Sequence, residues 1–168
     1  MARPRTQTNA EIFPHVLTAL VENGEKALTF GSLAQRCGLA PATLAQRFGT
    51  VDQMICAALG AEWDRLSQAL SQAEAEAMNS AKGAQALLKT LPCPDPSMLA
   101  YSLRHETLRE TAAAWRAQVE AALAARRGGG TKGREAAALL FAAWQGRALW
   151  ENGGGKGFRL SDLLKAIS

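Results

Sequence analysis

Residues 29–48 read TFGSLAQRCGLAPATLAQRF and place two short helical patterns on either side of a glycine. Gly38 supplies the backbone freedom that a tight turn between helices requires. Ala34, four residues earlier, is small enough to let the two helices cross closely. These features are typical of a helix-turn-helix, whose second helix lies in the major groove of DNA. Since the same spacing occurs in ordinary helical bundles, it predicts the two-helix turn and leaves DNA binding open.

The rest of the chain also reads as helix. Alanine is abundant and β-branched residues are sparse, which favours helices because alanine loses the least entropy there. No stretch of any length alternates polar and apolar residues as a half-buried strand would. We therefore predict an all-α protein of about nine helices for this chain of 168 residues.

Capping residues and glycines set the predicted helix ends. Thr8 with Glu11 fits a capping box that opens the first helix, and Thr29 can cap the second. Asp52 can cap a long fourth helix that runs to about residue 78. The later predicted segments are a helix over 97–127 with a break near Arg109, a flexible glycine connection over 128–133, a helix over 134–150 and a last helix ending at Ile167.

Residues 12–55 carry a more specific pattern, which includes ENGEKALTFGSLAQRCGLAPATLAQRFGTVDQM. This stretch resembles the N-terminal domain of TetR-family transcriptional regulators. A weaker resemblance covers AALLFAAWQGRALW followed by FRLSDLLKAI. The resemblance implies a three-helix helix-turn-helix DNA-binding domain over residues 1–52. A long linker helix would then lead into a helical ligand-binding and dimerisation domain over residues 53–168.

Three positions depart from the family pattern. Where the family has a Tyr, a Lys and a capping Ser or Thr, this sequence has Ala45, Val51 and Ala40. The family's Tyr and Lys typically contact phosphates, and such contacts position a protein on DNA and supply much of its affinity. A missing cap costs a helix about 1 kcal/mol. The DNA contacts that remain as predictions are Arg3, Arg5, Thr29, Arg36, Pro41, Ala42, Thr43, Gln46 and Arg47.

Base recognition is assigned to the second helix of the motif. Gln46 can read adenine, Arg47 can bind guanine or a phosphate, and Ala42 can contact a thymine methyl group. Arg3 and Arg5 form a basic arm suited to a minor groove, with a solvated tail as the alternative. The formal net charge of +4 permits contact with phosphates but does not establish it.

The second predicted domain has aromatic side chains at helical spacing. They can line an apolar ligand cavity, or they can pack as an ordinary core. A polar cluster over residues 104–106 can anchor a carboxylate or lie on a solvated face. The predicted pocket residues are Met98, Tyr101, Arg104, His105, Trp115, Phe141 and Trp144.

The sequence does not indicate an enzyme. No glycine-rich phosphate loop follows a strand, and His105 cannot form a triad with its immediate neighbours because adjacent helical residues do not face each other. His15 and His105 are far apart, with no cysteine or carboxylate at ligand spacing. We therefore predict no metal and no cofactor.

Residues 134–150 read REAAALLFAAWQGRALW and are apolar nearly all round. One helix cannot bury every face against so small a domain. We therefore predict a two-fold homodimer with a four-helix bundle, in which this helix pairs with 108–127 or 159–167. Such a dimer places two recognition helices on the half-sites of a pseudo-palindromic double-stranded operator. The predicted interface residues are Leu140, Ala143, Trp144, Gly146 and Trp150.

Cellular location follows from what the sequence lacks. No apolar run spans a bilayer, and the N-terminal residues lack the apolar region of a signal peptide. Cys37, Cys56 and Cys93 are odd in number and far apart, which indicates free thiols in a reducing cytoplasm. The predicted function is a cytoplasmic, dimeric, TetR-like DNA-binding regulator, a repressor released by a small apolar ligand. The alternative is a TetR-fold protein without specific DNA binding that acts as an adaptor or as an antagonist of another regulator.

Overall fold

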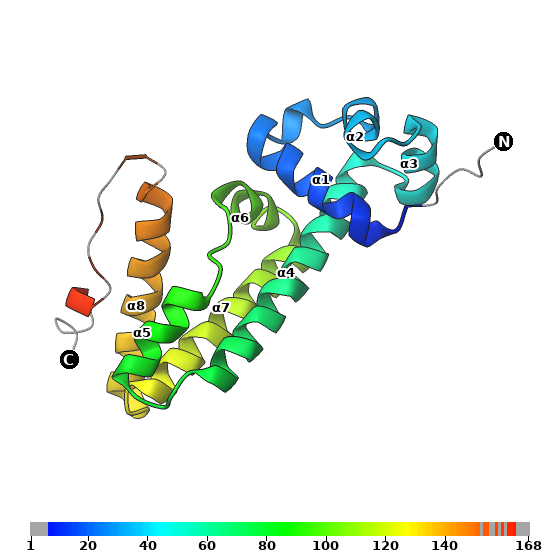
Figure 1. Cartoon of the computed structure of the whole chain (residues 1–168). Helices are drawn as coiled ribbons and strands as arrows, with labels where there is room; N and C mark the ends of the chain where they lie inside the picture. Colours follow the sequence, from blue (N-terminus) through cyan, green and yellow to red (C-terminus); the bar gives the residue numbers. More distant parts are fainter. Residues whose placement is uncertain (1–6, 152, 155–156, 158, 160, 164–168) are drawn as a thin grey trace. The chain divides into compact units, whose positions relative to one another are not determined.

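A computed structural model describes residues 7–151, 153–154, 157, 159 and 161–163. Within these residues it contains helices and no strand, which confirms the all-α prediction. Figure 1 shows the helices coloured along the chain. In chain order they are α1 (Asn9–Asn23), the short 3-10 helix η1 (Glu25–Ala27), α2 (Phe30–Cys37), α3 (Pro41–Phe48), α4 (Val51–Glu76), α5 (Ala81–Thr90), α6 (Pro96–Ser102), α7 (Glu106–Arg126) and α8 (Gly130–Glu151).

The chain divides into two units. The first comprises Met1–Glu62 and Ser97–Arg109, and the second comprises Trp63–Pro96 and Glu110–Ser168. The first unit therefore holds α1, α2, α3, the start of α4, and α6. It reaches further along α4 than the predicted boundary after residue 52. The second unit holds the rest of α4, α5, most of α7, and α8.

The core of the first unit is built on α1, α2 and α3. Thr8 opens α1 with a capping box, as predicted: its hydroxyl accepts the N–H of Glu11, and the Glu11 carboxylate accepts the N–H of Thr8. Apolar residues three and four positions apart then form one buried face of α1. The side chains that fill this core are Ile12, Val16, Leu20, Leu33, Leu44, Met54 and Ile55.

The second unit has an aromatic core. The ring centroid of Trp115 in α7 lies 5.6 Å from that of Trp63 in α4. It lies 6.0 Å from the Phe141 ring and 6.4 Å from the Trp144 ring, both in α8. The rings are tilted or edge-on, which aromatic pairs prefer to a face-to-face stack. All four side chains are buried, so three of the predicted pocket residues take part in packing this core.

A buried arginine closes the end of α4. Arg126, at the end of α7, has only 8% of its side chain exposed. Its guanidinium donates to the carbonyl oxygens of Ala122 (2.9 Å), Glu74 (2.9 Å) and Ala77 (3.2 Å). The last carbonyls of a helix have no N–H partner within the helix. Arg126 therefore supplies donors that the end of α4 lacks.

The predicted cap of α4 is wrong. The helix begins at Val51, and its cap is Thr50 rather than Asp52. The Thr50 hydroxyl accepts the N–H of Gln53 at 3.1 Å, and the Gln53 side-chain oxygen accepts the N–H of Thr50 at 3.0 Å. This reciprocal pair is a capping box, which leaves the Asp52 carboxylate available for other contacts.

Two predicted boundaries in the later part of the chain are also wrong. The break between α6 and α7 lies at residues 103–105, not near Arg109. The segment 128–133 is not a flexible connection, because α8 already begins at Gly130. Gly128 and Gly129 before the helix and Gly130 at its start have φ values between +63° and +88°, which L side chains rarely adopt. Of the predicted last helix, residues 161–163 are helical, Arg159 is not, and residues 160 and 164–167 lie outside the described residues.

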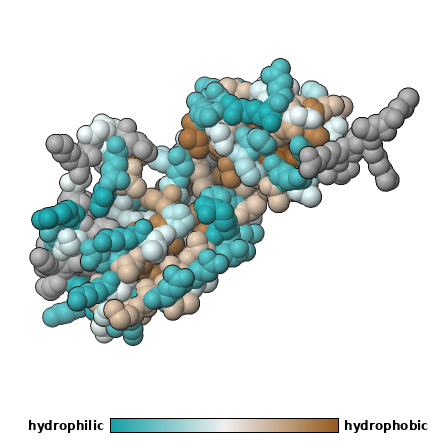
Figure 2. Space-filling view, viewed as in Figure 1, coloured by the Kyte–Doolittle hydropathy of each residue, from teal (hydrophilic) through white to brown (hydrophobic). Residues whose placement is uncertain are grey.

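The exposed surface is mixed in character. Figure 2 shows hydrophilic side chains over much of the face in view, with apolar side chains between them. Among the described residues, no helix combines the length and the apolar character needed to cross a membrane.

Candidate nucleic-acid interface

The turn between α2 and α3 has the predicted geometry. Gly38 ends α2 with φ at +67° and ψ at 30°, a left-handed conformation that glycine adopts without steric cost. Its N–H and that of Leu39 both donate to the carbonyl oxygen of Ala34. At the other end of α2, the Thr29 hydroxyl accepts the N–H of Ser32 at 3.1 Å, which confirms the predicted cap. The sequence therefore forms two short helices joined by a tight turn.

Helix α3 is buried on one side only. Leu44 is fully buried, while Ala45 and Phe48 are half-buried. Residues on the other side of an eight-residue helix remain available to a partner. The predicted contact residues exposed on α3 are Pro41, Ala42, Thr43, Gln46 and Arg47.

The start of α3 has no side-chain cap. Ala40 occupies the capping position and makes no side-chain hydrogen bond there. The first turn of α3 therefore keeps backbone N–H groups that no side chain satisfies, at the positive end of the helix dipole. At the positions where the resemblance leads one to expect Tyr and Lys, Ala45 and Val51 are half-buried aliphatic residues. Neither can reach a phosphate.

The charges on this part of the chain are balanced. Residues 7–50 hold three acidic and three basic side chains, so their formal net charge is zero. Arg36, a predicted DNA contact, forms an ion pair with Glu22 of α1 at 2.6 Å. The predicted arm residues Arg3 and Arg5 lie outside the described residues. Positive charge for binding phosphates is therefore scarce on the described part of the helix-turn-helix.

Arg47 has an internal partner. Its guanidinium Nη1 donates to the backbone carbonyl of Gln7 at 2.7 Å. This bond holds the chain just before α1 against α3, across 40 residues of sequence. A guanidinium has five N–H donors, so one such contact leaves others for a nucleic acid.

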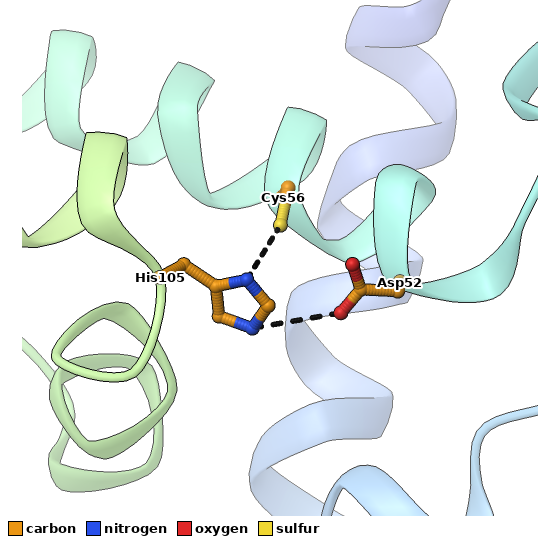
Figure 3. A group of neighbouring side chains, drawn as sticks. All are labelled: Asp52, Cys56 and His105. Carbon is orange, nitrogen blue, oxygen red and sulfur yellow. Dashed lines mark hydrogen bonds and ion pairs between the residues drawn. The ribbon is translucent and has the colours of Figure 1, made fainter.

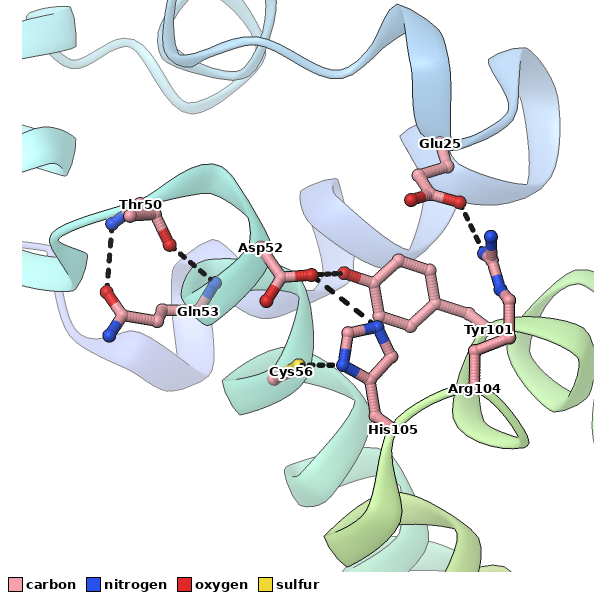
Figure 4. A network of polar contacts seen from close by, with 8 residues as sticks. All are labelled: Glu25, Thr50, Asp52, Gln53, Cys56, Tyr101, Arg104 and His105. Carbon is pink, nitrogen blue, oxygen red and sulfur yellow. Dashed lines mark hydrogen bonds and ion pairs between the residues drawn. The ribbon is translucent and has the colours of Figure 1, made fainter.

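A polar cluster, which we call the Tyr101 cluster, joins α4 to the segment around the α6–α7 turn (Figure 4). The Tyr101 hydroxyl donates to Asp52 Oδ1 at 2.5 Å, and the Tyr101 ring stacks on the His105 ring with centroids 4.5 Å apart. His105 Nδ1 lies 3.6 Å from Cys56 Sγ, and its Nε2 lies 3.5 Å from Asp52 Oδ1. Arg104 lies over the Tyr101 ring and pairs with Glu25 of η1, which completes the cluster.

Burial shifts the proton affinity of two members of the Tyr101 cluster. It raises the pKa of the Tyr101 hydroxyl far above its ordinary value, and the hydrogen bond to Asp52 raises this pKa further. Burial also raises the pKa of the Cys56 thiol, with the nearby Asp52 charge as the second cause. Both groups are therefore neutral near pH 7, and Tyr101 acts as a hydrogen-bond donor.

The Tyr101 cluster contains residues that sequence reasoning missed. Tyr101 and His105 were expected near a ligand, but Asp52 and Cys56 were not expected beside them. The two halves are 49 residues apart along the chain. The prediction of no metal rested on the absence of a cysteine or carboxylate at ligand spacing from either histidine in the sequence. In the folded chain, Cys56 and Asp52 lie close to His105. One signal was present, since Asp52 and Cys56 are four residues apart and so share a helix face.

The predicted pocket residues divide between the two units. Met98, Tyr101, Arg104 and His105 belong to the first unit, and the three aromatic residues belong to the second. Met98 is buried, like Tyr101, whereas Arg104 is exposed. The sequence-predicted set therefore does not form one cavity within either unit.

The second unit holds a pocket of about 490 Å³. Trp144 is the predicted pocket residue that lines it. Arg147 on its wall pairs with Glu151 at 2.6 Å. Burial, followed by the charge of Asp95, raises the pKa of the Cys93 thiol on the same wall to about 11. The pocket thus has mixed walls, which include Leu88, Leu91, Cys93, Trp144, Arg147 and Glu151.

Helix α8 buries two of the five residues predicted for a dimer interface and leaves Ala143, Gly146 and Trp150 exposed or half-buried. Leu140 and Trp144 are buried within the second unit, so they offer little surface to a partner. Trp150, also predicted, is 68% exposed. The apolar and small residues that α8 leaves exposed or half-buried at the surface include Leu139, Ala142, Ala143, Gly146, Leu149 and Trp150.

Neither a protein-family model nor a curated protein matches the sequence. Solved structures match the fold. A transcriptional regulator from Rhodococcus sp. Rha1 superposes with a TM-score of 0.73 at 21% identity, over 96% of this chain and 92% of that one. A TetR transcriptional regulator from Legionella pneumophila gives 0.67 at 14% identity, over 98% and 97% of the two chains. The multidrug binding protein EbrR, in complex with malachite green, gives 0.67 at 20% identity, over 96% of each chain. The chain therefore has the fold of TetR-type transcriptional regulators.

Proposed function

We propose that this chain is a cytoplasmic DNA-binding transcriptional regulator of the TetR type that acts as a homodimer and represses its target. The exposed face of α3 carries the proposal. It presents Thr43, Gln46 and Arg47 on the second helix of a helix-turn-helix, in a fold that solved transcriptional regulators share. Such a helix enters the major groove, where its exposed side chains can contact base edges.

The balanced charge of residues 7–50 limits the number of phosphate contacts expected from this part of the chain. Each neutralised phosphate contributes a slope of about −0.9 to the dependence of log affinity on log salt concentration. With Arg36 paired to Glu22, few phosphate contacts come from the described helix-turn-helix. We therefore expect base contacts from α3, together with charge from Arg3 and Arg5, to account for most of the affinity.

Alanine variants at Gln46 and Arg47 are expected to weaken binding of the selected operator. A good bidentate base contact contributes about 1–3 kcal/mol, so each loss corresponds to roughly 5- to 150-fold in affinity. The operator is first obtained by selection from random double-stranded DNA, and affinity is then measured by fluorescence anisotropy at several salt concentrations. Gln118→Ala and Arg116→Ala, on the exposed surface of α7, are matched controls that should bind as the wild type does.

Arg47→Lys separates base recognition from charge. Lysine keeps the positive charge but loses the planar fork, so it should retain phosphate contact and lose preference for guanine. The proposal fails if selection enriches no sequence above background. A stable protein partner recovered together with no retention of DNA at low salt would instead support the adaptor function.

The dimer proposal is supported by the exposed face of α8. Leu139, Gly146, Leu149 and Trp150 recur at helical spacing and lie along one side of the helix. Among the described residues, a Cβ placed on Gly146 would meet nothing within 4 Å, which favours close approach of a second helix there. A two-fold axis would bring this face onto its own copy.

Trp150→Glu is expected to shift the protein from dimer to monomer. Buried tryptophans at the centre of an interface commonly contribute 2 kcal/mol or more, so the dimer affinity should fall by about 30-fold or more. Sedimentation velocity at micromolar concentration measures the shift. Met78→Glu is the matched control because Met78 is equally exposed and lies outside α8. A wild-type protein that is monomeric under these conditions would contradict the proposal.

We place the effector in the pocket of the second unit. Its wall combines Leu88, Leu91 and Trp144 with paired charges, which suits a small molecule that is mainly apolar. The EbrR structure of the same fold contains malachite green. A compound that acts as the proposed effector must raise the melting temperature and weaken operator binding in the same concentration range.

A further inference from the structure

Three side chains of metal-binding type meet in the first unit (Figure 3). Asp52 and Cys56 lie one turn apart on α4, and His105 lies just before α7. One ligand atom from each residue can be chosen so that the three atoms all lie within 4.8 Å of one another. This grouping is separate from the exposed face of α3 and from the pocket of the second unit.

We propose that Asp52, Cys56 and His105 bind a divalent transition-metal ion of the Zn²⁺ class. Carboxylate, thiolate and imidazole are the ligands that zinc takes in proteins, so binding of the ion displaces the proton of the neutral Cys56 thiol into solvent. For a tetrahedral ion, bond lengths of about 2.3 Å to sulfur and 2.0–2.1 Å to nitrogen place these two atoms about 3.5 Å apart. The distance between Cys56 Sγ and His105 Nδ1 is 3.6 Å, so this pair already has the spacing of two ligands.

The third ligand requires a small movement. One imidazole nitrogen can bind a given ion, whereas His105 now directs Nδ1 to Cys56 and Nε2 to Asp52. The Asp52 side chain is 58% exposed, so its carboxylate has room to turn toward an ion shared with the other two residues. Cys56 and His105 are half-buried. The three residues thus leave a fourth position facing solvent, through which the ion can enter and where water or another ligand can bind.

Neighbouring residues orient the proposed ligands before an ion binds. The Tyr101 hydroxyl donates to Asp52 Oδ1, and the Tyr101 ring stacks on the imidazole with an interplanar angle of 11°. Such outer contacts orient metal ligands and commonly change metal affinity by about 10- to 100-fold. Arg104 does not leave an uncompensated positive charge beside the site, because it pairs with Glu25. Figure 4 shows these contacts around the three proposed ligands.

Cobalt is the probe for this site. The full-length chain is titrated with Co²⁺, and we expect one ion per chain with the near-ultraviolet absorption of a thiolate–cobalt bond, which Zn²⁺ then removes. Cys56→Ser should abolish that absorption. His105→Gln and Asp52→Asn should lower the affinity at least 10-fold. Cys93→Ser, which removes a thiol from the second unit, should leave the titration unchanged.

Two results of the cobalt titration would contradict the proposed metal site. Thiolate–cobalt absorption that persists in Cys56→Ser, or that disappears in Cys93→Ser, would place the metal elsewhere. A folded wild type that takes up no Co²⁺ would show that the three residues do not form a metal site. Far-ultraviolet circular dichroism verifies that each variant is folded. If Cys56→Ser does not fold, the decision rests on the shift in melting temperature with Zn²⁺, which the wild type should show and His105→Gln should lack. DNA binding is not part of this test.

Discussion

Trp115→Ala is expected to lower the free energy of unfolding by about 3–5 kcal/mol, the usual cost of removing a buried tryptophan side chain. Trp115 is 2% exposed and packs against three other aromatic rings. The variant loses these contacts and leaves a cavity that the neighbouring rings cannot fill without moving. Urea unfolding followed by circular dichroism, at a fixed protein concentration, measures the change.

Trp115→Phe is expected to lose less stability than Trp115→Ala. The indole Nε1 of Trp115 is buried and has no hydrogen-bond partner among the described residues. Phenylalanine keeps most of the aromatic contact and removes that unpaired donor, so it should cost clearly less than alanine. Met78→Ala is the control, because Met78 is 68% exposed and its truncation should change stability by at most about 0.5 kcal/mol. Equal losses for Phe and Ala at position 115 would contradict the assignment of Nε1 as unpaired.

Arg126→Met is expected to lower the free energy of unfolding by about 2–4 kcal/mol, because two partly buried acceptors lose their donor and a buried acceptor left unpaired costs about 1–3 kcal/mol. The affected acceptors are the carbonyl oxygens of Glu74 and Ala77 at the end of α4. Methionine preserves much of the apolar volume of the arginine stem but donates nothing. Urea unfolding of the variant at matched concentration provides the measurement.

Arg116→Met is the matched control for Arg126→Met. Arg116 lies on the same helix and forms an exposed ion pair with Glu120 four residues later. Such pairs contribute about 0.3–0.5 kcal/mol, so this variant should differ little from the wild type. If both variants lose the same stability, the bonds from Arg126 to α4 do not contribute as described.

Local signals in the sequence predicted the helix-turn-helix well. Thr8, Thr29 and Gly38 each act within four residues of their own position, through capping or a turn, and all three occur as expected. The cap of α4 was misassigned although its signal was equally local. Thr50 and Gln53 form the capping box, but an acidic residue in the first turn also favours a helix start and drew the prediction to Asp52.

Contacts between distant residues could not be predicted in this way. Arg126 meets the end of α4 across 49 to 52 residues, and His105 meets Cys56 across 49. Helical periodicity assigns a residue to a face of its own helix but does not say which helix covers that face. The residues predicted for the dimer interface illustrate the same point, because periodicity does not say which of them another helix covers. Leu140 and Trp150 both read as apolar positions on one helix, yet the first is buried in the second unit and the second is exposed.

The charge balance of residues 7–50 bears on how a regulator of this kind would search a genome. Attraction to DNA of arbitrary sequence comes almost entirely from cations that neutralise phosphates. A helix-turn-helix with no net charge holds such DNA weakly, so it leaves wrong sites quickly. If the chain binds DNA as proposed, it would reach its target by repeated collisions from solution more than by sliding along the duplex. The arginines at positions 3 and 5 would set how long each collision lasts.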